Sequence, residues 1–419
     1  MKVTDIRVKH GTSCELDATV KAMSPRKTFQ LFYRFPAEFA KTVQVSADPF
    51  IAALLLPSME LGEPLIVDAP VSPRLLRALP KIMAICHNWD PRYKIIEVRT
   101  SKERPDSDSI SKANALFFSG GLDSFYALTK LTEQTAEKNH LSHLIFLHGF
   151  DIKLNDNMLF DRSYVAVKEI ASYYGKKLVL VSTNVKDITD KYVAWGNWYG
   201  AVLASVALCF NGFFDQVYIA SDLGPYEAKR ASHPDLGDKL GNQGRHLDPL
   251  WSTQATNITH CYPGISRIEK AKTIANNPMA QKHLRVCWEN RNGAYNCGSC
   301  SKCVRTMLPL HLAGALSNFD FPTILTPELI KGVDYGPDTN ATLHREEILN
   351  EIVNELQRRG EHQLANALSQ TTKKTSLSND ELSRKIDAIS TDLQRQFDAI
   401  YRSPPVRLYL ALKRLLERH

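Results

Sequence analysis

Residues 119–124, read as Ser-Gly-Gly-Leu-Asp-Ser, have the composition of a loop that binds an anion. Glycines at 120 and 121 allow positive φ angles and let several backbone N–H groups approach one ligand. An apolar run ends at Ser119 and a helical pattern begins near Asp123, so the positive end of a helix dipole lies behind the loop. The stretch therefore predicts a strand, a tight turn and a helix start that together hold a phosphate.

The type of phosphate site follows by exclusion. A dinucleotide fold needs a third glycine and a mononucleotide P-loop needs a lysine, and this turn has neither. Asp123 instead faces the expected ligand, and a carboxylate beside a polyphosphate requires a bridging cation such as Mg²⁺. The plainer alternative is a strand-to-helix turn in which the glycines serve packing and Asp123 caps the helix.

Four cysteines form a second chemical motif. Cys287, Cys297, Cys300 and Cys303 give the spacing C-x9-C-x2-C-x2-C, and Gly298 follows the second of them. Two residues between cysteines allow a turn to direct both thiolates at one ion, and four sulfurs leave no open position for water, which favours a structural zinc. An iron–sulfur cluster and a redox cysteine pair are the alternatives.

The elements expected to position these residues alternate between strand and helix. Apolar runs at 144–147, 178–181 and 217–220 alternate with helical patterns at 123–131, 163–174 and 197–210. This order predicts an α/β fold with a parallel sheet covered by helices on both faces. Because ligands of such sheets bind beyond the carboxyl ends of the strands, the important loops are 148–156, 184–198 and 221–251. The last is either a binding loop or a disordered segment.

The rest of the chain divides into three parts. Residues 1–100 are expected to form a separate α+β module with strands at 2–8, 29–35 and 93–98 and a helix at 73–86, and residues 101–114 are expected to be a linker. A core of 115–316 and a helical region of 317–419 follow. In that last region we expect apolar stripes through Ile348, Ile352 and Leu356, through residues 382–400, and on a terminal helix at 408–415.

The composition of the chain indicates its number of domains and the class of protein to which it belongs. The chain has 419 residues and 43% hydrophobic residues, which is enough for two or three globular domains. The longest apolar run, 51–56, is too short to span a membrane, and the N-terminus lacks a signal-peptide core, so we expect a cytoplasmic protein. The formal charge of +7 suits a polyphosphate or a nucleic acid without requiring either.

The loop after the strand resembles the pyrophosphate loop (PP-loop) of the ATP pyrophosphatases, an adenine nucleotide alpha hydrolase-like fold. With the cysteine cluster, residues 115–316 resemble the 7-cyano-7-deazaguanine synthase family, which makes the nitrile preQ0 from 7-carboxy-7-deazaguanine, ammonia and ATP. Ile268-Glu269-Lys270-Ala271 is similar to the family's Ile-Asp-Lys-Ala, and two weaker matches are Asp248-Pro249-Leu250 and His233-Pro234-Asp235.

The resemblance implies roles for particular residues. It implies ATP and pyrophosphate binding by Ser119, Gly120, Gly121, Leu122, Asp123 and Ser124; catalysis by Asp123 and Lys270; zinc binding by Cys287, Cys297, Cys300 and Cys303; and substrate binding by Asn197, His233 and Asp235. The implied cofactors are ATP, Mg²⁺ and Zn²⁺.

The chain departs from this family on the acceptor side. The family's Tyr-Gly-Gln-Arg-His is here residues 148–152, His-Gly-Phe-Asp-Ile, and its Pro-Gly-Arg-Asn is reduced to Trp-Gly-Asn at 195–197. Two basic residues are therefore missing. The longer chain resembles the synthase-like proteins of bacterial anti-phage operons such as Qat, which implies partner proteins from such an operon.

The expected function is ATP-dependent adenylation of a carboxylate, such as that of 7-carboxy-7-deazaguanine, with release of pyrophosphate and transfer to a nitrogen nucleophile. That nucleophile is expected to be an amine on a partner protein. The alternatives are a catalytically silent, nucleotide-sensing subunit of a defence complex, preQ0 synthesis, and tRNA modification, the last of which would require binding of nucleic acid.

Overall fold

The structure is a computed structural model of the chain, and it describes residues 1–23, 26–104, 113–133, 140–210, 212–222, 224, 246–333 and 342–375. The strands are β1 (Lys2–His10), β2 (Ser13–Ala22), β3 (Lys27–Pro36), β4 (Leu65–Val71), β5 (Val98–Glu103), β6 (Ala113–Phe117), β7 (His143–His148), β8 (Lys177–Thr183), β9 (Phe214–Ala220) and β10 (Asn257–Cys261). The helices are α1 (Asp48–Leu61), α2 (Pro73–Trp89), α3 (Leu122–Thr132), α4 (Asn157–Tyr173), α5 (Val185–Thr189), α6 (Tyr199–Leu208), α9 (Arg267–Ile274), α10 (Pro278–His283), α11 (Ser301–Leu312), α12 (Pro327–Gly332), α13 (Thr342–Arg358) and α14 (His362–Thr375). The α/β class predicted from the alternating pattern is confirmed, as are the strands β7, β8 and β9.

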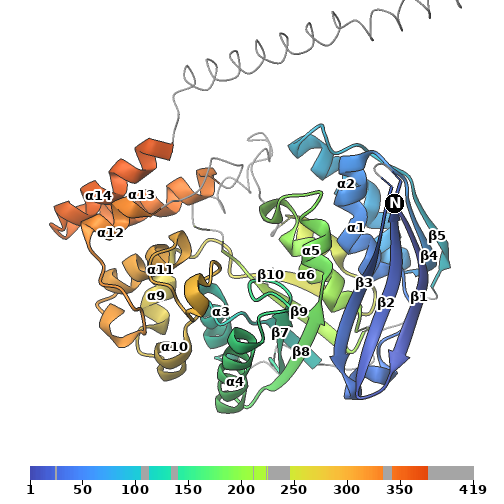
Figure 1. The fold of residues 1–419 in the computed structure, drawn as a ribbon, viewed down its shortest axis with the longest axis horizontal. Helices are drawn as coiled ribbons and strands as arrows, with labels where there is room; N and C mark the ends of the chain where they lie inside the picture. The colour runs from blue at the N-terminus through green and yellow to red at the C-terminus, as the bar shows by residue number, and fades with distance from the viewer. Residues whose placement is uncertain are drawn as a thin grey trace, which may run out of the picture.

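One sheet of ten strands runs through the molecule in the order β10-β9-β6-β7-β8-β3-β2-β1-β4-β5 (Figure 1). Strands β10, β9, β6, β7 and β8 pair in parallel, with β6 in the middle. The pairs β8–β3, β3–β2 and β2–β1 are antiparallel, and β1–β4 and β4–β5 are parallel again. The sheet is therefore mostly parallel, and its N-terminal strands extend the same sheet as the later ones.

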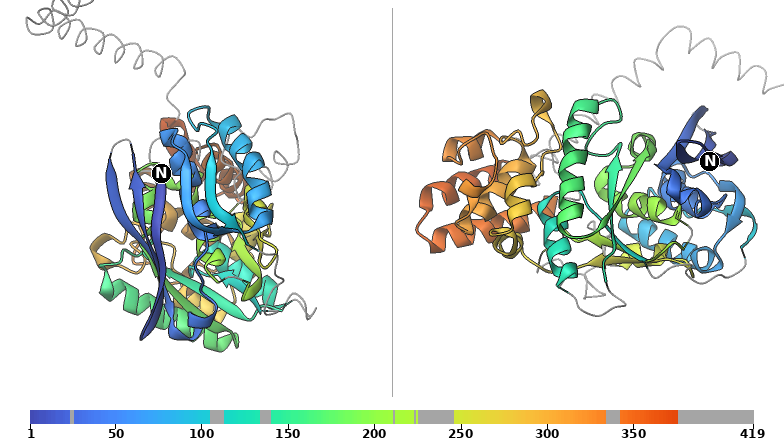
Figure 2. Two further views of the ribbon diagram at one scale, coloured as in Figure 1. Left: turned by 90° about the vertical axis from the view of Figure 1, so that its right-hand side faces the viewer. Right: turned by 90° about the horizontal axis from the view of Figure 1, so that it is seen from below.

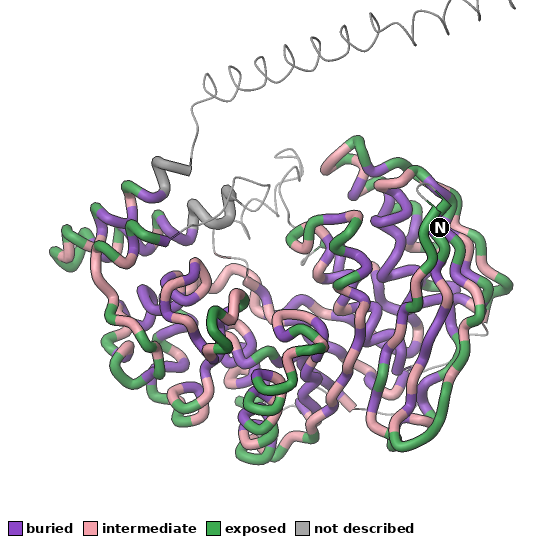
Figure 3. Tube along the Cα trace, viewed as in Figure 1, coloured by how far each residue is buried: buried purple, intermediate pink, exposed green. Residues whose placement is uncertain are grey.

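Side chains alternate between the two faces of the central strands, and helices cover both (Figure 2). Ala115 and Phe117 of β6 join a hydrophobic cluster that includes residues of α1, α2 and α6. Leu116 on the same strand faces a second cluster with residues of α3, α4, α9 and α10. The face of α4 that points away from the sheet is exposed, whereas most residues of the strands β6 and β7 are buried (Figure 3). This alternation is what a strand with two covered faces requires.

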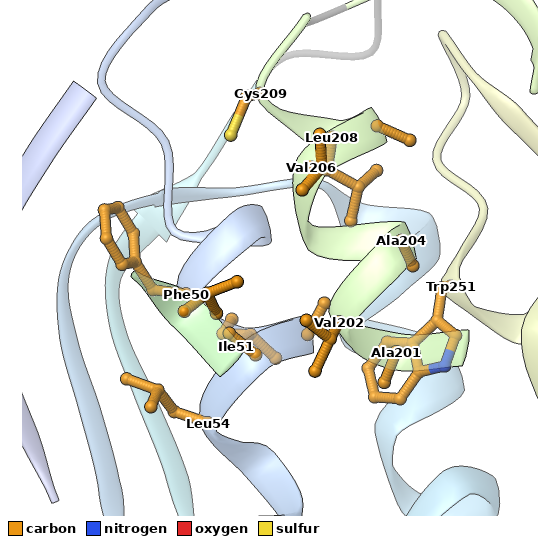
Figure 4. Close-up of a cluster of buried hydrophobic side chains, with 14 of the residues drawn as sticks. Phe50, Ile51, Leu54, Ala201, Val202, Ala204, Val206, Leu208, Cys209 and Trp251 are labelled. Carbon is orange, nitrogen blue, oxygen red and sulfur yellow. The ribbon is translucent and has the colours of Figure 1, made fainter. Parts of the chain in front are cut away.

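The N-terminal residues do not form a separate module, and this expectation is corrected. Helices α1 and α6 pack directly against each other, with Ile51 of α1 beside Val202 of α6 (Figure 4). The Trp198 indole Nε1 also donates a hydrogen bond of 2.9 Å to the carbonyl oxygen of Ala53. The first hydrophobic cluster is thus continuous from α1 and α2 to the central strands.

Two smaller expectations are also wrong. The range 101–114 begins inside β5 and ends inside β6, so these residues are not simply a linker, although 105–112 lie outside the described residues. The strand expected at 93–98 starts only at Val98. Lys94 N donates instead to Met59 O at the end of α1, which directs this backbone away from a ladder.

The C-terminal helices pack onto the core through a third hydrophobic cluster. Ile348, Ile352 and Leu356 of α13 are buried together with Ile268 of α9 and Leu308 of α11. The predicted apolar stripe at 348–356 is therefore confirmed, while the stripes at 382–400 and 408–415 lie outside the described residues. None of the helices that the structure describes has the length and apolarity needed to cross a bilayer.

Candidate functional site

The turn between β6 and α3 has the strand–turn–helix form predicted for residues 119–124. Gly120 has φ +78°, in the left-handed region, whereas Gly121 is extended, so only one of the two glycines uses a positive φ. Ser124 Oγ donates to Gly121 O at 3.0 Å, and Gly120 O accepts from Arg285 N at 2.9 Å. The Leu122 side chain is buried in the second cluster, which leaves only its backbone for a ligand.

Asp123 lies in the first turn of α3 and is held by two cations from α9. Lys270 Nζ donates to Asp123 Oδ1 at 2.7 Å, and Arg267 Nη1 donates to Asp123 Oδ2 at 3.1 Å. Lys270 is fully buried and also donates to Ser221 O at 2.6 Å, just beyond β9. The two residues that the sequence assigned to catalysis are thus brought into direct contact at the carboxyl ends of β6 and β9.

The electrostatics of Asp123 follow from these contacts. Burial raises the pKa of its carboxyl, but the charges of Lys270 and Arg267 outweigh that effect, so the pKa lies below its ordinary value. The charge of Asp222 acts in the opposite direction. Asp123 is therefore ionised, as a cation ligand must be, but a divalent cation at its carboxylate would also meet the positive charges of the two basic groups.

A second acid–base contact lies beside the first turn of α6. His260 Nδ1 on β10 is 3.0 Å from Asp248 Oδ2, and both side chains are buried. Burial raises the pKa of Asp248 above its ordinary value despite the histidine. A Cβ on Gly200 would lie only 2.0 Å from Asp248 Oδ1, so this approach requires glycine at position 200. Tyr199 next to it places its hydroxyl 3.3 Å from Asp222 Oδ1.

The loops that follow β7 and β8 approach each other. The rings of Phe150 and Trp195 meet edge to face at 5.3 Å, and Lys186 Nζ lies 4.8 Å from the centre of the Trp195 ring. Lys302 of α11 pairs with Asp151 at 3.2 Å. Both lysines have carboxylate partners, Lys186 in Asp190 and Lys302 in Asp151, so what this edge offers a planar ligand is its aromatic rings.

Of the three residues predicted to bind substrate, the structure describes one. Asn197 Nδ2 donates to the hydroxyl of Tyr93 at 3.2 Å, so its side chain contacts the N-terminal part of the chain. His233 and Asp235 lie outside the described residues. Their roles in substrate binding remain predictions.

The four cysteines come together as the spacing predicts. Their sulfurs all lie within 4.8 Å of one another; Cys287 and Cys300 are 3.9 Å apart, and Cys297 and Cys303 are 4.0 Å apart. One tetrahedral zinc with Zn–S bonds of about 2.3 Å requires sulfurs about 3.8 Å apart. A cluster of several irons would hold its ligands farther apart because the irons lie between them, so the geometry suits a single ion such as zinc.

The backbone around the cysteines supports the same interpretation. Asn290 N lies 3.3 Å from Cys287 Sγ, and Cys303 N lies 3.4 Å from Cys300 Sγ, so two N–H groups face the sulfurs. Gly298 has φ +71°, and a Cβ there would lie 2.3 Å from Thr323 Oγ1. Donors to sulfur and a glycine-dependent turn are typical of thiolate metal sites.

Sequence reasoning missed Arg267, although a signal was present. Arg267 and Lys270 are three residues apart on one helix and therefore share a face. Arg267 also donates to Thr306 Oγ1 at 3.3 Å, one turn beyond the cysteine Cys303 on α11. It thus links the turn at Asp123 to the helix that contains Cys303 and is capped by Cys300.

Comparisons with protein-family models, with curated proteins and with solved structures found no match for this chain.

Proposed function

We propose that this chain binds ATP at the β6–α3 turn and uses it to adenylate a carboxylate, releasing pyrophosphate. The observation that carries the proposal is the contact between Asp123 and the buried Lys270, which are 147 residues apart in the sequence and meet at the end of the glycine turn. A buried lysine beside a phosphate-type turn can neutralise charge where water cannot.

The arrangement of the sheet supports a PP-loop type of doubly wound fold. With β6 in the middle, β7 and β8 lie on one side and β9 and β10 on the other, so the strand order reverses beside β6. Such a reversal opens a crevice beyond the carboxyl ends of the strands. The turn at residues 119–124 and Ser221 both lie at that edge.

The charges of the residues at the turn suggest which part of ATP each of them binds. The backbone N–H groups of the turn and the hydroxyls of Ser119 and Ser124 bind the β and γ phosphates, and Lys270 neutralises the α phosphate when the carboxylate attacks it. Mg²⁺, held by Asp123, would supply charge neutralisation for the leaving pyrophosphate. The zinc expected at the four cysteines has no free position and would hold the α10–α11 region in place.

The acceptor side motivates the substrate proposal. We propose 7-carboxy-7-deazaguanine, or a closely similar planar carboxylate, as the group that is adenylated, because aromatic rings lie in the loops after β7 and β8. The nitrogen acceptor we propose is an amine on a partner protein, in a cytoplasmic anti-phage system like that of the resembling operons. The resemblance to 7-cyano-7-deazaguanine synthases motivates both choices.

The test is release of pyrophosphate and AMP from ATP, with and without 7-carboxy-7-deazaguanine. Asp123→Asn is expected to abolish release while zinc content stays unchanged. Because the variant leaves the buried Lys270 without its charge partner, we expect a lower melting temperature, so release is measured at a temperature at which circular dichroism shows the variant folded. Asp161→Asn on the exposed face of α4 is the matched control. Release from the Asp123→Asn protein at the wild-type rate would remove this turn from the mechanism. Intact-mass spectrometry of candidate partners then tests the acceptor, since nitrile formation from ammonia with no added mass on a partner would contradict it.

A nucleotide-sensing subunit without turnover is the second candidate. The Asn197 amide donates to the Tyr93 hydroxyl, so a side chain to which the resemblance assigns substrate binding is engaged within the chain, which favours loss of turnover. ATP binding without adenylate or pyrophosphate in the same incubation would favour this sensor.

A further inference from the structure

Both oxygens of the Asp123 carboxylate are occupied by basic side chains, and the two basic groups are held unequally. Lys270 has a second acceptor in Ser221 O at 2.6 Å and no exposed side-chain surface. Arg267 makes longer contacts, 3.1 Å to Asp123 and 3.3 Å to Thr306, and its side chain keeps 13% exposure. Its Nε is buried and has no hydrogen-bond partner among the described residues.

The surrounding charges also act on Arg267. Asp222 lies near Asp123, and Glu351 of α13 lies near Arg267, whose charge lowers the pKa of the Glu351 carboxyl against a larger raising effect of burial. Arg267 therefore lies between the Asp123 turn and the C-terminal helices. A guanidinium has five N–H donors, and two of those on Arg267 donate to partners that the structure describes, so it retains capacity for another anion.

We propose that Arg267 changes partner during ligand binding. In the resting site it neutralises Asp123; when a polyphosphate enters, the guanidinium moves to the phosphate oxygens and frees Asp123 Oδ2 for a divalent cation. This inference rests on the proposed function, because it assigns an order of binding to the same site. The planar fork of arginine suits this exchange, since it pairs with carboxylate and phosphate in the same bidentate geometry.

The exchange has a consequence for the divalent cation. A carboxylate already paired with two cations repels a third positive charge, so the divalent cation binds weakly until the polyphosphate has drawn Arg267 away. The polyphosphate therefore binds first and the divalent cation follows. Loss of the Arg267 charge should weaken polyphosphate binding and strengthen binding of the free cation, two effects of opposite sign.

The test uses Mn²⁺ alone, followed by electron paramagnetic resonance, and radiolabelled pyrophosphate alone, followed by equilibrium dialysis. In Arg267→Gln we expect Mn²⁺ to bind about tenfold more tightly and pyrophosphate about tenfold more weakly than in the wild type, the size expected for one charge-assisted hydrogen bond. Asp123→Asn gives the background for Mn²⁺ bound elsewhere. Arg99→Gln, at an exposed arginine of β5, is the control for lost charge.

The two opposite shifts separate the exchange from a merely structural role, which would weaken both ligands together. Unchanged or jointly weakened binding in Arg267→Gln would overturn the exchange and leave the proposed function standing. A wild-type protein that binds neither pyrophosphate nor ATP would overturn both. If Arg267→Gln fails to fold, Arg267→Lys keeps the charge, and tightened Mn²⁺ binding in that variant would contradict the electrostatic argument.

Discussion

Replacing Gly200 by alanine gives the sharpest prediction about the buried acid–base pair. The added methyl group would lie 2.0 Å from Asp248 Oδ1 and 2.8 Å from its Cγ, and Asp248 is fully buried. The carboxylate must move by more than 1 Å, about the difference from an ordinary contact of ~3.5 Å. That displacement breaks its 3.0 Å contact with His260.

The magnitude follows from those two effects. Leaving the buried Asp248 carboxyl without its hydrogen-bond partner costs about 1–3 kcal/mol, and crowding this packed site costs about 1–3 kcal/mol more. The helix preference of alanine over glycine returns only about 0.5–1 kcal/mol. We therefore expect Gly200→Ala to lower the free energy of unfolding by about 3 kcal/mol. Gly332→Ala in α12 is the control, because nothing lies within 4 Å of the Cβ it would add.

A double-mutant cycle measured by urea unfolding tests the cause. In an Asp248→Ala background the clash is gone, so adding Gly200→Ala should change stability by less than about 1 kcal/mol. An equal loss in both backgrounds would refute the reasoning, because the damage would then arise from the helix and not from the carboxylate.

Two further predictions concern the metal and pH. Cys300→Ser is expected to lower zinc content and melting temperature together, because metal-binding free energy is then folding free energy; a zinc-depleted variant that melts like the wild type would argue against a structural ion. Burial lowers the pKa of His143 to about 4, below an unfolded value of about 6.5, so its contribution to stability is complete above about pH 6.5 and is lost as pH falls toward about 4. This contribution is at most roughly 3 kcal/mol, and His143→Leu should flatten the pH dependence of urea unfolding in that window; an identical slope in both proteins would contradict it.

The local parts of this structure were predictable from the sequence. The turn at residues 119–124, the apolar strands of the core and the cysteine cluster each depend on neighbours in the chain, and the structure contains all three. Strand β2 was missed although Cys14, Leu16, Ala18 and Val20 alternate inward, because a short alternating pattern of small residues is a weak signal. Helix α1 is buried nearly all round and so lacks the polar face that reveals a helix.

The contacts that build the site were less accessible because they join distant segments. Arg267 reaches Asp123 across 144 residues, and the approach of Asp248 to Gly200 depends on how the short helix Asp248–Trp251 packs against α6. The motifs identified Lys270 but gave no reason to place a second cation beside it. The sequence did not predict one continuous sheet for the same reason. The pairing of β3 with β8 follows from tertiary packing and not from a local pattern of residues.

The pairing of β3 with β8 also sets an order of events during synthesis. Asn184 accepts a hydrogen bond from Phe32 N and donates one to Gln30 O. The edge of β3 therefore has no partner strand until a segment about 150 residues later has been synthesised. Until then the strands β1–β3 present an open edge to other nascent chains, and contacts of such long sequence separation form slowly. The first third of the chain therefore depends on the middle third to complete its fold, and translation that stalls before β8 leaves an aggregation-prone product.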